Sequence, residues 1–317
     1  MNRIWRIIGQ RLLLGVLTLF IISVVIFGAT ELLPGDLASQ LLGQSATKET
    51  LNALREQLGL NLPAPIRYWN WLTGFLQGDF GTSMATKKPI SELVGARLVN
   101  TLFLSLYAAA LAVPISLTLG VLAALWRNSI FDRASNAVAL TAISFPEFFV
   151  AYILILWLSQ SGFFPSMVRI TEATTTLNLL YMAFLPALAL TLVVTAHMMR
   201  MTRAAIINVL ASPYIEMSLL KGMSPMRVVL RHAVPNALAP IINVVAVNLA
   251  YLITGVVVVE VVFVYPGLGQ LMIDAVTNRD IAVVQTIALL FASAYVLLNL
   301  IADVLSTITN PRLMHGR

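Results

Sequence analysis

The chain of 317 residues contains no cysteine and few charged residues, and each shortage excludes a class of protein. Without cysteine it can form neither a disulfide framework nor a thiolate metal site. Only 11% of its residues are charged, compared with roughly one quarter in ordinary soluble domains, whereas 59% are hydrophobic. This composition excludes a soluble globular domain and indicates an integral membrane protein.

Motifs for nucleotide and metal chemistry are also missing. None of the four lysines follows a glycine, so the chain has no G-x-x-x-x-G-K-[ST] phosphate loop. The histidines, His197, His232 and His315, lack the i, i+4 spacing and the acidic neighbours of a zinc site. We therefore predict no catalytic, metal-binding or cofactor-binding residue and no enzyme activity in this chain.

Six stretches without charged residues are long enough to cross the hydrocarbon of a bilayer, which takes about 20 apolar residues. They cover residues 12–30, 98–126, 148–168, 173–199, 233–259 and 281–302. We expect the third span to begin nearer Ala134, which places Pro146 and Glu147 inside it. The sequence therefore predicts an all-α membrane protein with six transmembrane helices.

The distribution of positive charge predicts the orientation, because cytoplasmic segments carry an excess of lysine and arginine. With the N-terminus inside, twelve of the twenty such residues fall in inner segments. Six of the other eight lie in one long outer loop, where the rule is weak. We expect both termini and residues 212–237 to be cytoplasmic. The net charge of +6 comes largely from residues beside the spans, which suits contact with membrane lipid and not with nucleic acid.

The long outer loop after the first span contains two amphipathic segments. Thr47 is the expected N-cap of the first segment, and Gly59 ends it. The second segment carries Tyr68, Trp69 and Trp71, which are residue types enriched at membrane interfaces. We predict a small periplasmic cap of short helices that lie on the bilayer.

Ionisable residues within or near the predicted spans are candidates for a translocation path, because such groups are costly in a bilayer. Glu147 in the third span and His197 near the inner end of the fourth could line a path for a solute. The alternative for each is a structural group near a helix end that reaches water or a backbone carbonyl. Glu260 and Asp303, at the ends of the last two spans, are expected to anchor the helices at the interface.

Residues 212–237 interrupt the apolar pattern with two short helical segments joined by a glycine. A serine–proline pair starts each helix, namely Ser212–Pro213 and Ser224–Pro225. Gly222 ends the first helix, and the second runs on toward the fifth span with a bend at Pro235. Apolar residues rimmed by charge suit either a docking element for a partner or an interfacial helix on the inner leaflet.

This segment resembles the EAA loop of ATP-binding-cassette (ABC) importer permeases. That loop has a glutamate, two small residues, a glycine six positions after the glutamate, and a leucine–proline pair further on. The corresponding residues are Glu216, Met217, Ser218, Gly222, Val234 and Pro235. Met217 and Ser218 stand in place of two alanines, and Val234 stands in place of leucine.

Further stretches are similar to the dipeptide, oligopeptide and nickel branch of these permeases, and specifically to its first permease subunit. They are LPGD at 33–36, LGLNLP at 58–63, GDFGTS at 78–83, TAISFPEFF at 141–149, EVVFVYPGLGQLMIDAVTNRD at 260–280 and NPR at 310–312. The asparagine in NPR departs from the acidic residue usual in the branch. The resemblance covers nearly the whole chain.

The resemblance implies a type I ABC importer permease fold within a heteromeric importer. Its other parts would be a second homologous permease subunit, two cytoplasmic ATP-binding subunits that carry ATP and Mg, and a periplasmic solute-binding protein. The helix before Gly222 would be the coupling helix that contacts an ATPase subunit. The residues assigned to coupling are Tyr214, Ile215, Glu216, Met217, Ser218, Lys221, Gly222 and Pro235.

The function implied by the resemblance is translocation of a small solute across the bacterial inner membrane by alternating access. Di- or oligopeptides are the first expectation, and nickel, glutathione or opine-like compounds are alternatives within the branch. An ion-coupled secondary transporter is a lower alternative. The expected division is 1–33 for the N-terminus and first span, 34–97 for the periplasmic loop, 98–310 for the permease core and 311–317 for the cytoplasmic tail.

Overall fold

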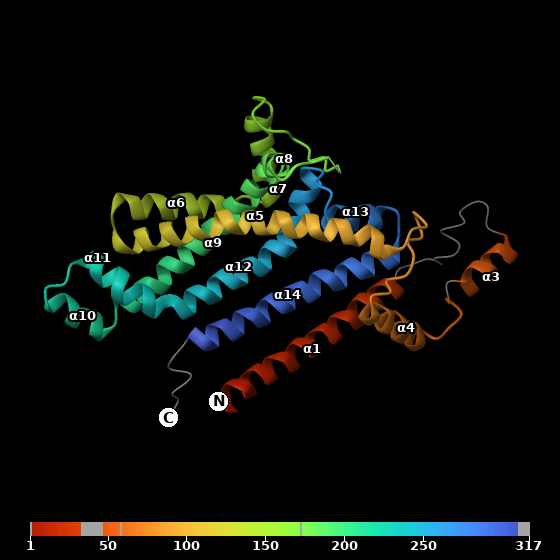
Figure 1. Cartoon of the computed structure of the whole chain (residues 1–317), viewed down its shortest axis with the longest axis horizontal. Coiled ribbons are helices and arrows are strands. Elements are labelled where there is room, and N and C mark those ends of the chain that lie inside the picture. Colours follow the sequence, from red (N-terminus) through yellow and green to blue (C-terminus); the bar gives the residue numbers. More distant parts are fainter. Residues whose placement is uncertain (1, 33–46, 58, 172, 310–317) are drawn as a thin grey trace.

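The computed structural model describes residues 2–32, 47–57, 59–171 and 173–309, and helices dominate these ranges (Figure 1). The elements are α1 (Asn2–Glu31), α3 (Lys48–Gln57), α4 (Ala64–Gln77), α5 (Ile90–Leu125), α6 (Ile130–Ser144), α7 (Glu147–Leu154), the π-helical turn η2 (Ile155–Ser159), α8 (Thr176–Met182), α9 (Phe184–Leu210), α10 (Pro213–Leu220), α11 (Pro225–Val228), the π-helical turn η3 (Val229–Ala233), α12 (Val234–Val262), α13 (Leu268–Thr277) and α14 (Ile281–Thr309). The LPGD and NPR stretches lie outside the described residues.

Five helical stretches in the described residues are long and apolar enough to cross a membrane: α1, α5, α9, α11 through α12, and α14. The bent pair α6 and α7–η2 brings the number to six when it is counted as one span. This agrees with the six spans predicted from the charge-free stretches. A 36-residue helix is about 54 Å long at 1.5 Å per residue, so α5 extends well beyond a hydrocarbon layer of roughly 30 Å.

The third span differs from the prediction because its two halves are bent by 103° relative to each other. α6 ends at Ser144, and Phe145 has an extended backbone because the following proline disfavours the helical conformation there. Pro146 is then the N-cap of α7, and Glu147 is the first residue of that helix. The prediction that both residues lie inside one helix is therefore wrong.

The fourth span also starts later than predicted. The segment before Phe184 contains the short helix α8, which Thr175 caps through its side chain, and α9 then continues to Leu210. The charge-free stretch does not reveal this boundary, because residues 173–183 carry no charge. These residues nevertheless do not form one continuous helix. α9 therefore extends eleven residues beyond the predicted end of the span at Met199.

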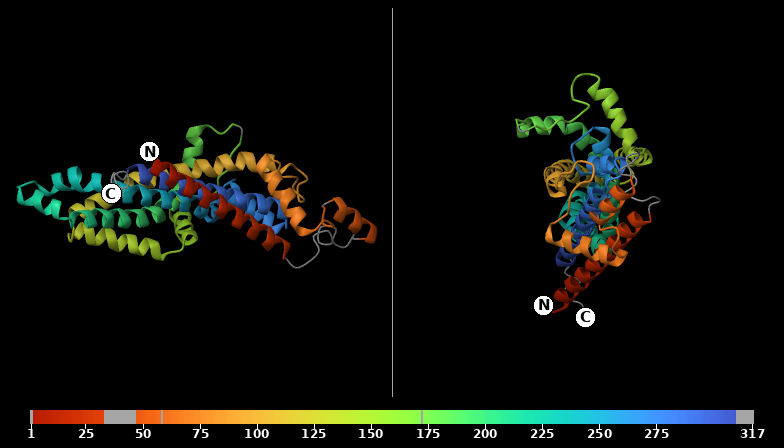
Figure 2. Two further views of the ribbon diagram at one scale, coloured as in Figure 1. Left: turned by 90° about the horizontal axis from the view of Figure 1, so that it is seen from below. Right: turned by 90° about the vertical axis from the view of Figure 1, so that its right-hand side faces the viewer.

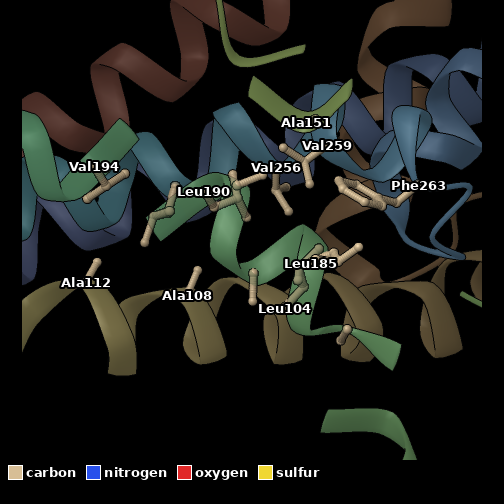
Figure 3. Close-up of a cluster of buried hydrophobic side chains, with 14 of the residues drawn as sticks. Leu104, Ala108, Ala112, Ala151, Leu185, Leu190, Val194, Val256, Val259 and Phe263 are labelled. Atoms are coloured by element: carbon tan, nitrogen blue, oxygen red, sulfur yellow. The ribbon is translucent and has the colours of Figure 1, made fainter. Parts of the chain in front are cut away.

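The main core surrounds α9, which packs against α5, α12 and α6. Figure 3 shows side chains from α5, α7, α9 and α12 meeting in one apolar cluster. On α5 the buried positions recur every four residues: Leu104, Ala108, Ala112, Ser116, Gly120 and Ala124. Small side chains at this spacing allow two membrane helices to approach closely.

α1 lies at the edge of the bundle and packs against α14 and α4. At its outer end, Tyr68 of α4 packs edge-on against Phe27 and shares a 2.7 Å hydrogen bond with Ser23. In the loop, Thr47 caps α3 as predicted, since its hydroxyl accepts from the Thr50 amide, and Gly59 adopts the left-handed conformation after it.

The two ends of the bundle carry different elements (Figures 1 and 2). The start of α1, the end of α14 and the α10–α11 segment lie toward one end, while α3, α4 and α13 lie toward the other. This placement fits an even number of crossings with the termini and residues 212–237 on one side. We call that side the inner side.

Candidate functional site

The α10–α11 segment begins each helix at the predicted serine–proline pair, although the serine side chains do not cap the helices. Ser212 has an extended backbone, and its hydroxyl donates to the carbonyl of Val209 in the preceding helix. Proline at the first helical position explains the two helix starts, because its fixed backbone angle suits that position and it has no N–H to satisfy there.

Gly222 ends α10 through backbone geometry that favours glycine. Its φ angle is +83°, in the left-handed region, and its N–H donates to the carbonyl of Leu219. The Met223 N–H reaches the carbonyl of Ser218 at 3.3 Å, so the two bonds together form a Schellman motif. The predicted stop is confirmed, and it fixes the angle at which the chain leaves α10.

The surface of α10 is largely apolar. Met217 is 55% exposed and Leu220 is 76% exposed, and Tyr214 and Leu219 are also exposed. Glu216, Lys221 and Gly222 lie on the same exposed segment, while Ser218 is partly covered and donates to the carbonyl of Tyr214. Ile215 differs from the other coupling candidates because it is only 1% exposed. It can hold α10 in place but cannot offer area to a partner.

The segment after α10 is tied directly to the bundle. α11, η3 and α12 run as one helical stretch from Pro225 to Val262, with a π-helical turn just before Val234 and Pro235. Val229 and Ala233 of η3 are buried in a cluster with Ile206 of α9 and Ala124 of α5. A displacement of α10 and α11 would therefore act on three spans at once. Pro235 is exposed at the start of α12.

Glu147 lies at the break between α6 and α7, where its carboxylate faces α12. It accepts a hydrogen bond from the hydroxyl of Tyr251. A Cβ atom placed on Gly255 would lie 3.3 Å from the carboxylate, so this glycine leaves room for the acid. The carboxylate thus joins the bent third span to the fifth.

His197 lies elsewhere, on the exposed face of α9. It lines a hollow of about 340 Å³ between α6 and α9 whose other lining residues are Asn136, Arg200, Met201, Arg203 and Ala204. Beside it, the guanidinium of Arg203 forms a bidentate pair with Asp132, at 2.6 and 2.7 Å. Glu147 and His197 are both predicted to line a translocation path, but they contact different helices.

Asp132 and Arg203 were not singled out from the sequence. Asp132 is buried in the first turn of α6, where its carboxylate also accepts from the Asn128 N–H and from the Asn136 amide. Serine is a preferred N-cap residue, so Ser129 marks the start of α6 in the sequence. In the structure its hydroxyl accepts a hydrogen bond from the Asp132 N–H. The partner on α9 could not be found from spacing, since it lies 71 residues along the chain.

The prediction that Glu260 anchors α12 at the membrane interface is wrong, because its side chain is fully buried. Its carboxylate accepts from the hydroxyl of Thr101 and from the N–H of Gly269, both at 2.6 Å. It thereby satisfies a free amide in the first turn of α13, where negative charge is also favoured by the helix dipole. Asp303 forms an ion pair with Arg11, at 3.0 Å, that joins α14 to α1.

The YPGL turn is locked against α5 by side chains that flank Glu260. Asn100 donates to the carbonyl of Pro266, and the hydroxyl of Tyr265 donates to the carbonyl of Asn100, both at 2.8 Å. Burial raises the pKa of the Tyr265 hydroxyl, so it stays a neutral donor. Among the described residues, no group of three or more His, Asp or Glu could hold a metal ion.

Comparison with known proteins identifies the family over nearly the whole chain. The profile of a family described as "Binding-protein-dependent transport system inner membrane component" matches residues 116–315, and that of its N-terminal companion matches residues 4–105. The glutathione transport system permease protein GsiC of Salmonella typhi is 37% identical over 307 residues, covering 96% of this chain and 98% of its own. GsiC of Escherichia coli strain K12 is 36% identical over the same shares.

Proposed function

The chain belongs to the family of inner-membrane components of binding-protein-dependent transport systems, and from this premise we propose that α10 is its contact with an ATPase subunit. The protein is a multi-pass permease subunit of an ABC importer in the dipeptide, oligopeptide and nickel branch. The family is one of membrane permeases that work with a solute-binding protein and ATPase partners. The proposal concerns where and how this chain engages them.

The exposed apolar surface of α10 supports this assignment. Met217 and Leu220 expose most of their side chains at the inner side of the bundle, next to the charged residues Glu216 and Lys221. Such a surface gains free energy when a partner covers it, at about 25 cal/mol for each Å² of apolar area. Its rigid attachment through Ile215 and η3 lets movement of a partner reach α5, α9 and α12.

We propose the following division of work between the subunits. Two ATP-binding subunits bind ATP and Mg and hydrolyse ATP, and this chain pairs with a second homologous permease. A periplasmic binding protein delivers the solute at the outer end of the two permeases. Closure of the ATPase pair then moves α10, and rocking of the attached spans exposes the path alternately to the two sides.

We propose that the solute is a small peptide of the glutathione type. The support is the similarity to glutathione permeases over 96% of the chain. Nickel and opine-like compounds remain the alternative within this branch. Glu147 is the acidic residue we assign to the path, because it lies at the bend of the third span and contacts the fifth.

The coupling role can be tested at Gly222 with a pair of substitutions. Gly222→Val is strained at φ +83°, whereas asparagine tolerates the left-handed region. A Cβ atom there meets nothing within 4 Å, so the valine variant tests backbone geometry without a steric clash. We expect Gly222→Val to lower both ATP-dependent glutathione uptake and transport-linked ATP hydrolysis by at least fivefold, and Gly222→Asn to retain most of each.

A second substitution tests the surface itself. Glu216→Lys reverses an exposed charge on α10, and we expect it to weaken co-purification of the ATPase subunits while membrane insertion stays normal. Normal transport and normal ATPase recovery in both Glu216→Lys and Gly222→Val would contradict the coupling assignment. If the wild-type importer lacks ATP-dependent glutathione uptake but transports another solute, only the proposed solute class is wrong.

A further inference from the structure

The hollow between α6 and α9 is lined mainly by basic and polar side chains. Its lining includes two arginines, Arg200 and Arg203, together with His197 and the amide of Asn136. Asp132 is the acid beside it, and that acid is already held by Arg203. The remaining lining therefore carries excess positive charge and hydrogen-bond donors.

The two arginines differ in what they contact. Arg203 has both ends of its guanidinium fork on the carboxylate of Asp132, so it serves the contact between α6 and α9. Arg200 lies one turn earlier on α9, is exposed, and makes no side-chain hydrogen bond or ion pair within the described residues. Arg203 therefore serves a contact within the protein, whereas Arg200 has no such partner among the described residues.

Arg200 lies near the inner end of the fourth span, one residue after the predicted end at Met199 and ten residues before α9 ends at Leu210. His197 lies within that predicted span. Ionisable groups within a membrane span pair with another group or line a water-filled cavity, and they mark solute pathways.

We propose that this hollow is a binding position for a carboxylate of the transported solute, with Arg200 as the cation that holds it. The guanidinium presents a planar fork that matches a carboxylate in two parallel hydrogen bonds. His197 and Asn136 line the same hollow and supply further polar contacts. The inference rests on the proposed function, since it assigns one step of the path to a peptide-type solute, which always carries a carboxylate.

The hollow thus complements Glu147 in charge. Glu147 faces α12 at the bend of the third span, whereas Arg200 lies on α9 at the hollow beside α6. A zwitterionic peptide has an ammonium group for the first and a carboxylate for the second. The hollow would select solutes that bear a free carboxylate and would disfavour nickel ions.

The test uses the complete importer reconstituted with its binding protein and ATPase subunits in sealed proteoliposomes. Two radiolabelled probes are compared, glutathione and glutathione with both carboxylates converted to amides, and uptake is measured per ATP hydrolysed. We expect Arg200→Gln to lower glutathione uptake per ATP about tenfold and to change uptake of the diamide less than twofold. The same binding protein serves every variant, so a change that depends on the variant belongs to the permease.

Two further variants serve as controls. Arg200→Lys keeps the charge and is expected to retain at least one third of glutathione uptake. Arg133→Gln removes an exposed positive charge from α6 outside the hollow and is expected to leave uptake unchanged. Unchanged glutathione uptake in Arg200→Gln overturns the inference. So does a loss of importer assembly or of ATP hydrolysis in Arg200→Gln, because that outcome assigns Arg200 a structural role.

Lipid phosphate is the other anion that could occupy a basic hollow near the inner leaflet. The assay is therefore repeated in proteoliposomes of phosphatidylcholine alone and of phosphatidylcholine with phosphatidylglycerol. We expect the Arg200→Gln defect in both membranes. A defect confined to phosphatidylglycerol membranes would identify a lipid site and overturn the inference. A wild-type importer that hydrolyses ATP but takes up no carboxylate-bearing probe contradicts the proposed solute class, a separate failure.

Discussion

At the scale of single residues, three glycines are required because neighbouring atoms occupy the space of a side chain. A Cβ atom on Gly120 would lie 2.8 Å from Cβ of Thr202 on α9. A Cβ atom on Gly267 would overlap the carboxylate of Glu260, and one on Gly269 would lie 2.5 Å from the backbone of Val257. The glycines of the YPGLGQ stretch therefore make room for Glu260 and for α12.

Gly120→Ala tests the close approach of α5 and α9. We expect it to lower stability by about 1–3 kcal/mol, because an added methyl group in a packed interface forces the helices apart. Gly95 lies on the same helix with nothing within 4 Å of its Cβ position, so Gly95→Ala is the matched control and should be neutral or slightly stabilising. Thermal unfolding of the purified importer measures both. Equal midpoints for the two variants would contradict the packing argument.

Glu260 offers a second test at the residue scale. Glu260→Ala leaves the buried Thr101 hydroxyl and the Gly269 N–H without their acceptor, which we expect to cost about 3 kcal/mol or more. Glu260→Gln keeps one acceptor oxygen and fills the same space, so its cost should be smaller. Protease resistance and thermal unfolding of the two variants can be compared directly. An alanine variant as stable as the wild type would show that the carboxylate does not hold α13.

At the scale of elements, two ion pairs of similar length are expected to differ in how much they stabilise the protein. The Asp132–Arg203 pair joins α6 to α9 and its acid is almost fully buried, whereas the Arg11–Asp303 pair joins α1 to α14 near the surface. We expect Arg203→Gln to destabilise the protein by about 3 kcal/mol, because a buried carboxylate loses its cation. Arg11→Gln should cost at most about 1 kcal/mol. Unfolding midpoints that fall equally in both variants would contradict this ranking.

The bend of the third span, between α6 and α7, has a local cause. Serine caps α6 at its start, and the Phe145–Pro146 pair ends it, since the proline cannot continue the hydrogen-bond ladder. Pro114 lies inside α5 without ending it, so proline alone does not predict a break. In the third span the bend is supported by the contact of Glu147 with Tyr251 on α12.

At the scale of the whole molecule, the even number of crossings can be tested by labelling, because the chain has no cysteine to interfere. Leu177 on α8 and Met226 on α11 are both exposed, and α8 precedes the start of α9 whereas α11 follows its end. We expect Leu177→Cys to react with a membrane-impermeant maleimide in intact spheroplasts, and Met226→Cys to react only after permeabilisation. Reaction of Met226→Cys in intact spheroplasts would invert the orientation.

Composition and charge by themselves determined the class of this protein, because a chain with so few charges cannot remain in water and its lysine and arginine bias sets the orientation. Local signals also determined the caps of the α10–α11 segment, since Pro213 and Gly222 act through their own backbones. The spacing from Glu216 to Pro235 pointed to the family before any geometry was considered.

Only the tertiary structure decided which polar groups meet. The pairs Asp132–Arg203, Thr101–Glu260 and Glu147–Tyr251 join residues 71, 159 and 104 positions apart, and no periodic pattern relates such distant positions. The structure likewise distinguishes Arg203, whose guanidinium pairs with Asp132, from Arg200, which lies exposed on the same helix. In a membrane the spans are uniformly apolar, so hydrophobic pattern indicates that a helix crosses but carries little information about its neighbours; packing of small residues and a few polar contacts selects them.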